Sequence, residues 1–445
     1  MSQRKSQGSK PRSPARRSEE PPVRGPVEVT VERVGARGDG LARWQGQALF
    51  VPQSLPGDRL MVEFAARRGD GWEARPVTLL QEGPGRAEPG CRHYGLCGGC
   101  ALQHMDDATY AAWKWDLART TLDRAGLLAG VEIRPLVRTP PAARRRAVLT
   151  ASRRGRRLWL GFNERASHRL IDLEQCPVLA PPLQALVAPL RPLLAGLLAD
   201  GQQIDVALTL LADGVDLVLE GLAEPALPQL ETLAAFAEAH DLARLTWRRK
   251  PGVPAEPVAL RRTGLVRFGG VAVCPAPGAF LQASAEGEAA LVQAACQGTA
   301  GAAQVADLFA GSGTLTFPLA GQAEQVHAVE GEPEGLRALT AGARQLPPGR
   351  VTVERRDLFK DPLSPPELAR FQAVVFDPPR AGAAAQAAAL AASSVPAVVA
   401  VSCNPASFAR DARTLVDGGY RLLELTPVDQ FLWSPHLELA ALFRR

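Results

Sequence analysis

A cysteine stands at the end of an unbroken apolar run near the C-terminus. The run, residues 398–401, is followed by Ser402, Cys403, Asn404 and Pro405. Such a run is typical of a strand that is buried on both faces in a parallel sheet, and the proline prevents a regular continuation of the strand. Open α/β sheets bind their ligands at the carboxyl ends of their strands. Cys403 is therefore a candidate nucleophile facing a crevice, although a cysteine beside a buried strand is more often only a small core residue.

A second set of cysteines has the spacing of a metal or cluster site. Cys91, Cys97 and Cys100 form a C-x5-C-x2-C pattern, and Cys176 is available as a fourth ligand. Thiolates this close would repel one another unless a cation lay among them. Four cysteines fit either a [4Fe-4S] cluster or a structural zinc ion, although the spacing differs from a zinc finger's pair of C-x2-C knuckles. The odd total of seven cysteines favours reduced thiols over a disulfide framework.

A glycine-rich turn follows a predicted strand in residues 305–314, which read VADLFAGSGT. A backbone without side chains can approach a bulky ligand, but one G-x-G is a weak sign, and the pattern of a phosphate-binding loop is absent. The predicted strands that follow end at Glu330, Asp357, Asp377 and Cys403. Helical segments separate them, so we expect a doubly wound parallel sheet, with Glu330 placed where a carboxylate binds ribose hydroxyls.

The N-terminal segments differ in composition from the rest of the chain. Residues 1–25 are polar and proline-rich, and their seven basic and two acidic residues match the whole formal charge of +5. Such a segment cannot repay the entropy of ordering, so we expect a disordered basic tail. Residues 26–85 contain short alternating segments separated by turn signals at 38–40, 56–58 and 69–71. This pattern predicts a small β-barrel that closes on itself.

The middle of the chain combines hairpins with clustered arginines. Two hairpins are predicted, at residues 143–162 and 205–219, and seven arginines fall within positions 144–157. A run of charge is usually a solvated face. So many unpaired cations beside Trp159 and Phe162 nevertheless favour a surface that contacts RNA.

Length and composition narrow the class of protein. The 445 residues suffice for about three domains, and a hydrophobic content of 46% is ample for packed cores. No apolar run approaches the roughly 18 residues that a membrane span needs, and residues 1–25 lack the apolar centre of a signal peptide. We therefore expect a cytoplasmic, monomeric protein that does not associate with membranes.

Taken together, several motifs resemble those of one family, the RNA 5-methyluridine (uracil-C5) methyltransferases. The resemblance covers about residues 26–445, and its cysteine cluster and TRAM-like barrel are similar to the iron–sulfur type that acts on 23S ribosomal RNA. The motifs that carry it lie at residues 161–169, 280–282, 307–314, 377–380, 402–405 and 434–438.

The resemblance implies a fold for each part of the chain. It implies an α/β architecture in which residues 271–445 form a doubly wound, Rossmann-like class I methyltransferase domain. Residues 26–85 would form an OB-like, RNA-binding TRAM barrel. Residues 86–270 would form a central α+β domain holding a [4Fe-4S] cluster through Cys91, Cys97, Cys100 and Cys176.

The chemistry of uracil explains why such an enzyme needs a cysteine and a base. Carbon 5 is a poor nucleophile, so a Cys403 thiolate that adds at carbon 6 would convert the ring to an enolate able to attack a sulfonium methyl group. A carboxylate must then remove the proton left on carbon 5, and the resemblance gives this role to Glu438. It also implies that Asp377 and Gln282 hold the edge of the uracil ring.

S-adenosylmethionine is the implied methyl donor. Arg380 would lie near the uracil, and Phe280 would stack on a flipped-out base. The residues implied to bind the donor are Gln282, Asp307, Phe309, Gly311, Gly313, Thr314, Glu330, Asp357 and Asp377.

Other functions share part of this pattern. The same chemistry on the TΨC-loop uridine of transfer RNA is the nearest alternative. Amino-group methylation would explain the Asp-Pro-Pro sequence at 377–379 but needs no cysteine nucleophile, and the radical motif of a methylthiotransferase is absent. A non-catalytic RNA-binding assembly factor is the alternative from a different class, and measurable methyl transfer would exclude it.

Overall fold

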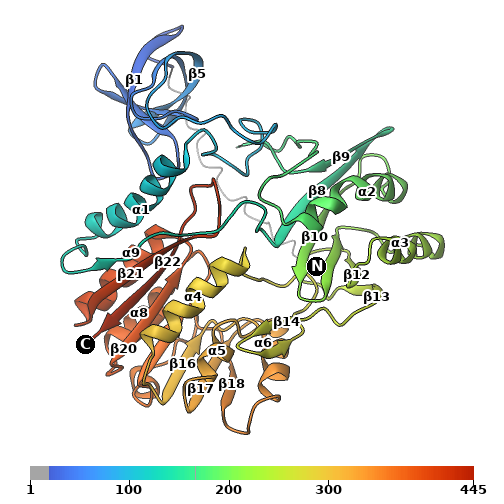
Figure 1. Ribbon diagram of the computed structural model, residues 1–445, viewed down its shortest axis with the longest axis vertical. Helices are drawn as coiled ribbons and strands as arrows, with labels where there is room; N and C mark the ends of the chain where they lie inside the picture. The colour runs from blue at the N-terminus through green and yellow to red at the C-terminus, as the bar shows by residue number, and fades with distance from the viewer. Residues whose placement is uncertain (1–19, 166) are drawn as a thin grey trace, which may run out of the picture. The chain divides into compact units, whose positions relative to one another are not determined.

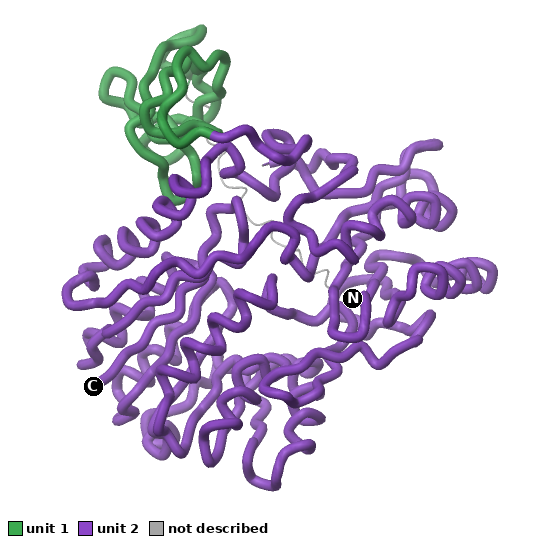
Figure 2. The backbone as a smooth tube through the Cα atoms, viewed as in Figure 1, with its two compact units in different colours: residues 1–86 green, residues 87–445 purple. Residues whose placement is uncertain are grey.

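The computed structural model describes residues 20–165 and 167–445. The chain divides into two compact units, residues 1–86 and 87–445 (Figure 2). Residues 1–19, most of the predicted basic tail, lie outside the described residues, so the predicted disorder stays a prediction. The predicted domain boundary at residue 270 falls inside the second unit and also stays a prediction.

The first unit contains a closed barrel of short strands, as the turn pattern predicted. The strands follow one another around the barrel in the order β1-β2-β3-β5-β4. They are β1 (Val27–Val34), β2 (Gly40–Trp44), β3 (Gln47–Val51), β4 (Arg59–Arg68) and β5 (Gly71–Gln81). Alternate side chains, among them Val29, Val31 and Leu49, fill the interior. Closure leaves no unpaired edge in this sheet.

A buried aspartate holds one end of the barrel together. Asp58 belongs to the predicted turn at 56–58, where Gly57 has a φ of 88°. Its carboxylate accepts hydrogen bonds from the backbone N–H groups of Leu55 and Gly83, both at 2.7 Å. It also pairs with Arg86. The turn residues therefore act through the hydrogen bonds that they make as well as through their backbone freedom.

A six-stranded sheet forms the middle of the second unit, and it contains both predicted hairpins. The strand order is β13-β12-β11-β10-β8-β9. The strands are β8 (Arg146–Arg154), β9 (Arg157–Gly161), β10 (Gln203–Leu211), β11 (Gly214–Glu220), β12 (Arg244–Arg248) and β13 (Glu256–Leu260). Two helices, α2 (Pro181–Leu197) and α3 (Leu227–Ala239), pack against it through a shared apolar core. A short hairpin of β14 (Val266–Phe268) and β15 (Val271–Val273) leads out of it.

The larger sheet of this unit is the predicted doubly wound one. Its order is β18-β17-β16-β19-β20-β22-β21-β6, and β7 also pairs with β21. Strands β16 to β20 run parallel, and β22 is antiparallel to both of its neighbours. The strands are β6 (Glu132–Ile133), β7 (Val137–Arg138), β16 (Gln304–Leu308), β17 (Gln325–Glu330), β18 (Val351–Arg355), β19 (Ala373–Phe376), β20 (Ala397–Ser402), β21 (Arg421–Asp429) and β22 (Glu438–Arg444).

Helices cover both faces of this sheet (Figure 1). On one face Val399 packs with Leu291 of α4, and on the other face Val398 packs with Phe408 of α9, because successive strand residues point to opposite faces. The helices of the second unit not yet given are α1 (Asp107–Arg124), α4 (Ala285–Gly298), α5 (Thr316–Ala320), α6 (Pro333–Ala343), α7 (Pro365–Leu368), α8 (Ala384–Ala391) and α9 (Pro405–Asp417). Within the described residues, no helix is long and apolar enough to cross a membrane.

The segment after the cysteine cluster packs on the doubly wound sheet, which the sequence pattern did not indicate. Leu117 and Leu122 of α1 join the apolar core beneath α9. Strands β6 and β7 then pair in parallel with β21 and extend the sheet by its edge. A part of the chain far from the methyltransferase motifs thus helps to build the sheet that presents them.

Candidate active site

The predicted catalytic side chains lie at one edge of the doubly wound sheet. Cys403 directly follows β20, and Asp377 directly follows the neighbouring strand β19. Glu438 opens β22, which runs antiparallel to β20 and places Leu439 opposite Ser402. Because these three strands are adjacent, one thiol and two carboxyl groups come together from positions far apart in the sequence.

The residues after Cys403 turn the chain sharply into a helix. Asn404 is the N-cap of α9: its side-chain oxygen accepts the N–H of Ala406 at 3.1 Å, and Pro405 occupies the first helical position. The Asn404 amide donates its N–H to the carbonyl oxygen of Arg380 at 2.9 Å. The capping residue therefore fixes the loop that carries Arg380 beside the thiol.

The environment of Cys403 favours the neutral thiol. Its pKa is raised to about 11, first by burial and then by the nearby Glu438 and Asp377 carboxylates, whereas Arg380 opposes the shift. The half-buried thiol is thus protonated in the free protein at neutral pH. Arg380 is the cation among these neighbours that favours the thiolate.

Two amide side chains connect the two carboxyl groups. Gln282 donates from Nε2 to Asp377 Oδ2 at 3.1 Å, and its own oxygen accepts Gln430 Nε2 at 2.7 Å. Gln430 Nε2 also donates to Glu438 Oε1 at 3.0 Å, and its oxygen accepts the N–H of Ala283 at 2.8 Å. A continuous chain of hydrogen bonds therefore runs between the carboxyl groups and fixes the orientation of both.

Both carboxyl groups have raised pKa values. Burial and the Asp377 charge raise the pKa of Glu438 to about 8, while the bond from Gln430 opposes the rise. Burial likewise raises the pKa of Asp377 to about 6, against the bond from Gln282. Neutral amides satisfy the carboxyl oxygens without supplying the positive charge that would make these groups ordinary acids. Glu438 can consequently exchange a proton near neutral pH.

Sequence reasoning missed Gln430, although it touches both Gln282 and Glu438. The residue directly follows β21 and lies eight positions before Glu438. An amide at the end of a buried strand is a detectable signal. The antiparallel pairing of β21 with β22, which brings it to Glu438, is not visible in the local pattern.

Most of the predicted donor residues lie at the ends of β16 and β17. Asp307 is fully buried and accepts the Thr316 hydroxyl at 2.5 Å. Its pKa is raised to about 7, mainly by burial and in part by the Asp377 and Glu330 charges, while the bond from Thr316 opposes the rise. Thr316 is a second residue that sequence reasoning missed.

The glycine-rich turn leaves space for a ligand. Phe309 has a φ of 63°, a left-handed conformation that is uncommon outside glycine, and Gly311 and Gly313 have φ values of 57° and 99°. Glu330 Oε2 accepts the N–H of Gly311 at 2.7 Å. A Cβ at Gly313 would lie 2.3 Å from an aromatic ring of α5, whereas a Cβ at Gly311 would meet nothing within 4 Å. The turn, with half-buried Thr314 after it, is therefore open at Gly311.

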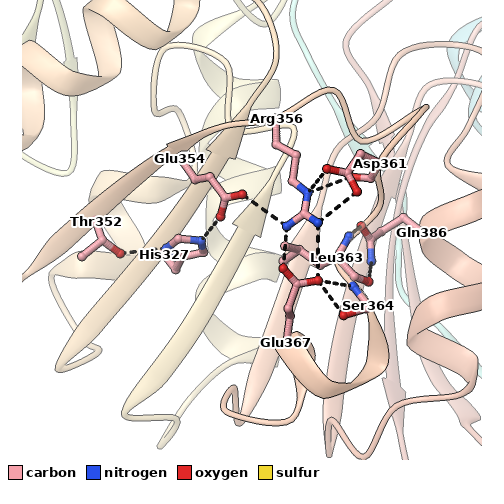
Figure 3. A network of polar contacts seen from close by, with 9 residues as sticks. All are labelled: His327, Thr352, Glu354, Arg356, Asp361, Leu363, Ser364, Glu367 and Gln386. Atoms are coloured by element: carbon pink, nitrogen blue, oxygen red, sulfur yellow. Dashed lines mark hydrogen bonds and ion pairs between the residues drawn. The ribbon is translucent and has the colours of Figure 1, made fainter.

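An arginine-centred network holds the loop after β18 (Figure 3). Arg356 pairs with Asp361 at 2.9 Å and with Glu367 at 2.7 Å, and these carboxylates raise its pKa. The loop carries Asp357 and also Phe359, whose ring is half exposed and lies 5.4 Å from the ring of Phe309. The network therefore fixes a side chain that faces the glycine-rich turn.

Four cysteines lie near one another, but their side chains are not arranged as ligands of a metal ion. The pKa of Cys100 is raised to about 12, first by burial and then by Cys176, Cys97 and Cys91, so the four sulfurs interact electrostatically. Within residues 20–165 and 167–445, no group of three or more His, Cys, Asp or Glu side chains is arranged to hold a metal ion. The Cys97 sulfur accepts the N–H of Gly99 at 3.5 Å.

The expectation of an unpaired arginine run is wrong for part of residues 144–157. Arg144 donates to the carbonyl of Arg146 at 3.0 Å, and Arg145 pairs with Glu288. Arg153 donates to two carbonyls at the end of α2, those of Ala195 and Leu198, both at 2.7 Å. These three arginines support the fold.

Two other arginines of the run do face aromatic rings. The guanidinium of Arg146 lies 4.6 Å from the ring centre of Phe280, which is 64% exposed. The guanidinium of Arg157 lies 4.7 Å from the ring centre of Trp159. Because Phe280 is two residues before Gln282, one of these pairs stands beside the catalytic edge of the sheet and offers a surface on which a base can stack.

Comparison with solved structures defines the class of this fold. The chain is similar to the Pyrococcus abyssi tRNA (uracil-54, C5)-methyltransferase, crystallised with S-adenosyl-L-homocysteine. The TM-score is 0.74 at 22% identity, with 94% of this chain and 100% of that chain covered. The fold is thus that of a methyltransferase.

Sequence comparisons identify the family. The model of the tRNA (Uracil-5-)-methyltransferase family matches residues 366–445, and the TRAM domain model matches residues 23–63. An uncharacterized RNA methyltransferase of Caulobacter vibrioides is 42% identical, over 94% of this chain and all of its own length. A 23S rRNA (uracil(1939)-C(5))-methyltransferase of Chromohalobacter salexigens is 37% identical over 94% of this chain and 89% of its own length. The chain belongs to the S-adenosylmethionine-dependent RNA uracil-C5 methyltransferases with an N-terminal TRAM domain.

The raised pKa of Glu438 predicts how stability depends on pH. The pKa of this group is about 8 in the folded protein, against an ordinary value of 4.5, so the folded state binds the proton more tightly than the unfolded state. Glu438 therefore favours folding at low pH, and that contribution is lost as the pH rises through about 8. Glu438→Gln removes the ionisation, so its melting temperature relative to the parent should increase between about pH 5 and pH 9.

The control for this measurement is Glu367→Gln. Its partner Arg356 lowers the pKa of Glu367 to about 2, so its ionisation does not change between pH 5 and pH 9. The difference in melting temperature for this control should stay constant across the range. A constant difference for Glu438→Gln as well would contradict the raised pKa.

Proposed function

We propose that the chain methylates carbon 5 of a uridine in 23S ribosomal RNA through a covalent adduct between Cys403 and carbon 6. The uracil-C5 methyltransferase class follows from the family. The 23S target is supported by one observation: 37% identity over 94% of the chain to the Chromohalobacter salexigens protein, whose name specifies that RNA. The adduct mechanism is supported by the position of a thiol beside two carboxyl groups at one edge of the sheet.

The first half of the reaction forms the adduct. Cys403 gives its proton to water and its sulfur bonds to carbon 6, which makes carbon 5 nucleophilic; the sulfur takes a proton back from water when it later leaves carbon 6. Arg380 favours the thiolate, and the hydrogen-bonded pair of Asp377 and Gln282 supplies an acceptor and a donor for the polar edge of uracil. Phe280, exposed and backed by Arg146, would stack on the extruded base.

The second half regenerates the thiol. Once carbon 5 carries the methyl group, its remaining proton must leave before the bond between sulfur and carbon 6 can break. Glu438 is suited to accept this proton because its pKa of about 8 makes its carboxylate a stronger base than an exposed glutamate. The products are 5-methyluridine, S-adenosylhomocysteine and a proton.

The residues present fit the methyl donor. S-adenosylmethionine, when bound, supplies the methyl group to carbon 5. The turn, which is open at Gly311, would accept its bulk, Glu330 would bind the ribose hydroxyls, and Asp357 with Phe309 would line the adenine side. Gly313 would follow the same turn. Asp307 and Thr314 complete the set of residues proposed to hold the donor.

Two substitutions separate the halves of the reaction. Cys403→Ala should abolish methyl transfer while RNA binding is retained, since the variant has no nucleophile. Glu438→Gln should form the methylated adduct but release it slowly, giving an RNA–protein band that survives denaturing electrophoresis and carries label from the methyl group. Appreciable turnover by Cys403→Ala, or no such band with Glu438→Gln, would refute the corresponding role.

The target RNA is tested by mapping 5-methyluridine in a strain that lacks this gene. We expect at least one 23S ribosomal site to lose its methyl group and to regain it when the parent gene is restored. Restoration with the Cys403→Ala gene should leave the site unmethylated. Loss confined to transfer RNA would keep the chemistry and overturn the 23S assignment, and no loss in either RNA would favour a non-catalytic role.

We also propose that Cys91, Cys97, Cys100 and Cys176 bind a [4Fe-4S] cluster. The proposal is supported by the proximity of the sulfurs: Cys176, Cys97 and Cys91 add to the rise that burial causes in the pKa of Cys100, and four thiolates this close would need a cation to balance their charge. The backbone N–H groups of two of these cysteines donate hydrogen bonds to side chains, that of Cys91 to Gln103 and that of Cys176 to Gln184. The cluster would tie the N-terminal cysteine segment to residue 176, between the two hairpins of the six-stranded sheet.

Metal analysis tests the cluster. Protein purified without oxygen should contain about four iron and four sulfide per chain and show a broad visible absorbance. Cys176→Ser should lose most of the iron, whereas Cys296→Ser, which changes a thiol outside this set, should keep it. Stoichiometric zinc without iron in the parent protein would overturn the cluster assignment.

A further inference from the structure

A buried ion pair joins helix α1 to the start of the segment that carries Glu438. Lys114 and Asp429 are both 0% exposed, and Lys114 Nζ lies 2.8 Å from Asp429 Oδ1. Tyr110, one turn earlier on α1, donates its hydroxyl to the other oxygen of Asp429 at 2.6 Å. Both oxygens of this carboxylate are thus held by a helix more than 300 positions away in the chain.

The same helix also holds the middle and the end of this segment, residues 429–438, which we call the base segment. The Tyr110 hydroxyl accepts the N–H of Trp433 at 2.8 Å, and Lys114 Nζ donates to the carbonyl of His436. The backbone N–H groups of Ala101 and Leu102, just after the cysteine cluster, donate to the Trp433 carbonyl at 2.8 and 3.1 Å. Residues 101–114 therefore hold the base segment at three points.

The base segment needs such support because its own conformation is unfavourable. Trp433 has a φ of 57°, a left-handed conformation that costs a bulky residue on the order of 1–3 kcal/mol. The connection from β21 to β22 also contains no regular secondary structure of its own between Gln430 and Leu437. Contacts from outside the segment are consequently what fixes its path.

A buried ion pair by itself adds little to the free energy of folding. Removing two charges from water costs about as much as their attraction returns, and apolar replacements of similar volume are often at least as stable. The pair of Lys114 and Asp429 is directional, however, because the ammonium and the Tyr110 hydroxyl fix both carboxylate oxygens. By fixing the chain at Asp429, the pair also positions the next residue, Gln430, which donates to Glu438 and to Gln282.

We propose that Lys114, Tyr110 and Asp429 are positioning residues for the removal of the proton from carbon 5, acting through Gln430 on Glu438. The proposal rests on the proposed role of Glu438 as the base. Cys403 lies between the end of β20 and the N-cap of α9, outside the base segment, so adduct formation depends less on this contact. Disturbing the contact should therefore slow resolution of the adduct more than its formation.

The experiment uses the full-length protein, its RNA substrate and methyl-labelled S-adenosylmethionine under single-turnover conditions. The test variant combines Lys114→Met with Asp429→Asn, which removes both charges together and leaves neither buried alone. We expect the labelled RNA–protein adduct to persist roughly 10- to 100-fold longer than in the parent, the effect of misplacing a catalytic group by about 1 Å. The rate of adduct formation should change by less than about threefold.

A matched control separates positioning from stability. Arg248→Met with Glu220→Gln removes another poorly exposed ion pair, which joins two strands of the six-stranded sheet. A variant that is only less stable has fewer active molecules, so adduct and product fall together and their ratio does not change. We expect the control to show this behaviour, at a melting temperature comparable with that of the test variant.

Tyr110→Phe provides a milder second variant in case the double substitution prevents folding. It removes only the hydroxyl that bonds to Asp429 and to the Trp433 N–H, and it should prolong the adduct in the same direction by a smaller factor. Resolution at the parent rate in both variants would overturn the proposal while leaving Glu438 as the base. Failure of Glu438→Gln itself to accumulate adduct would instead refute the proposed function on which it rests.

Discussion

The active site depends on keeping two buried carboxyl groups beside one thiol. Burial in a low-dielectric site raises the pKa values of Cys403, Glu438 and Asp377, and nearby negative charge adds to the rise for Cys403 and Glu438. A buried cation bound directly to each carboxylate would lower its pKa, and it would remove the basicity on which the proposed role of Glu438 depends. The protein uses neutral amides instead: Gln282 donates to one oxygen of Asp377 and Gln430 to one oxygen of Glu438, and neither cancels the charge.

The rest of the second unit can be understood as support for that arrangement. Strands β19, β20 and β22 set the spacing of the three groups, and the Asn404 cap ties the loop of Arg380 to the thiol. The ion pair between Asp429 and Lys114 of α1 lies one residue before the amide of Gln430. The ion pair thus fixes the position of the chain at Asp429, whereas neutral hydrogen bonds contact the two carboxyl groups whose pKa values are raised.

Local patterns in the sequence predicted those features that local residues decide. The apolar run before Cys403, the glycine-rich turn and the barrel turns each depend on a few neighbouring residues, and the strands and turns were found where expected. The roles given to Cys403, Glu438 and the donor residues came from motifs and stay predictions until they are tested. The arginine run was only partly understood, because pairing with Glu288 and capping of α2 depend on distant chain segments.

Apart from Thr316, whose partner Asp307 is only nine residues away, the features that the sequence did not reveal depend on long-range pairing. Nothing in the sequence around Gln430 distinguishes it from other amides, because its role depends on the pairing of β21 with β22. Tyr110 and Lys114 likewise resemble surface residues of an amphipathic helix, because their contacts with Asp429 are not visible in the local sequence. Strands β6 and β7, each of two residues, are too short to give an alternating pattern and exist because β21 is there to pair with. These two strands therefore form only when the sheet has assembled.

The placement of α1 has a consequence for synthesis on the ribosome. Lys114 and Asp429 are 315 residues apart, so at ordinary translation rates the helix leaves the ribosome roughly 15–60 s before its partner does. During that interval Leu117 and Leu122 have no β21 or α9 to cover them, and Lys114 stays in water. The last strands to be made, β21 and β22, therefore both bury the helix and bring Glu438 to the edge of the sheet.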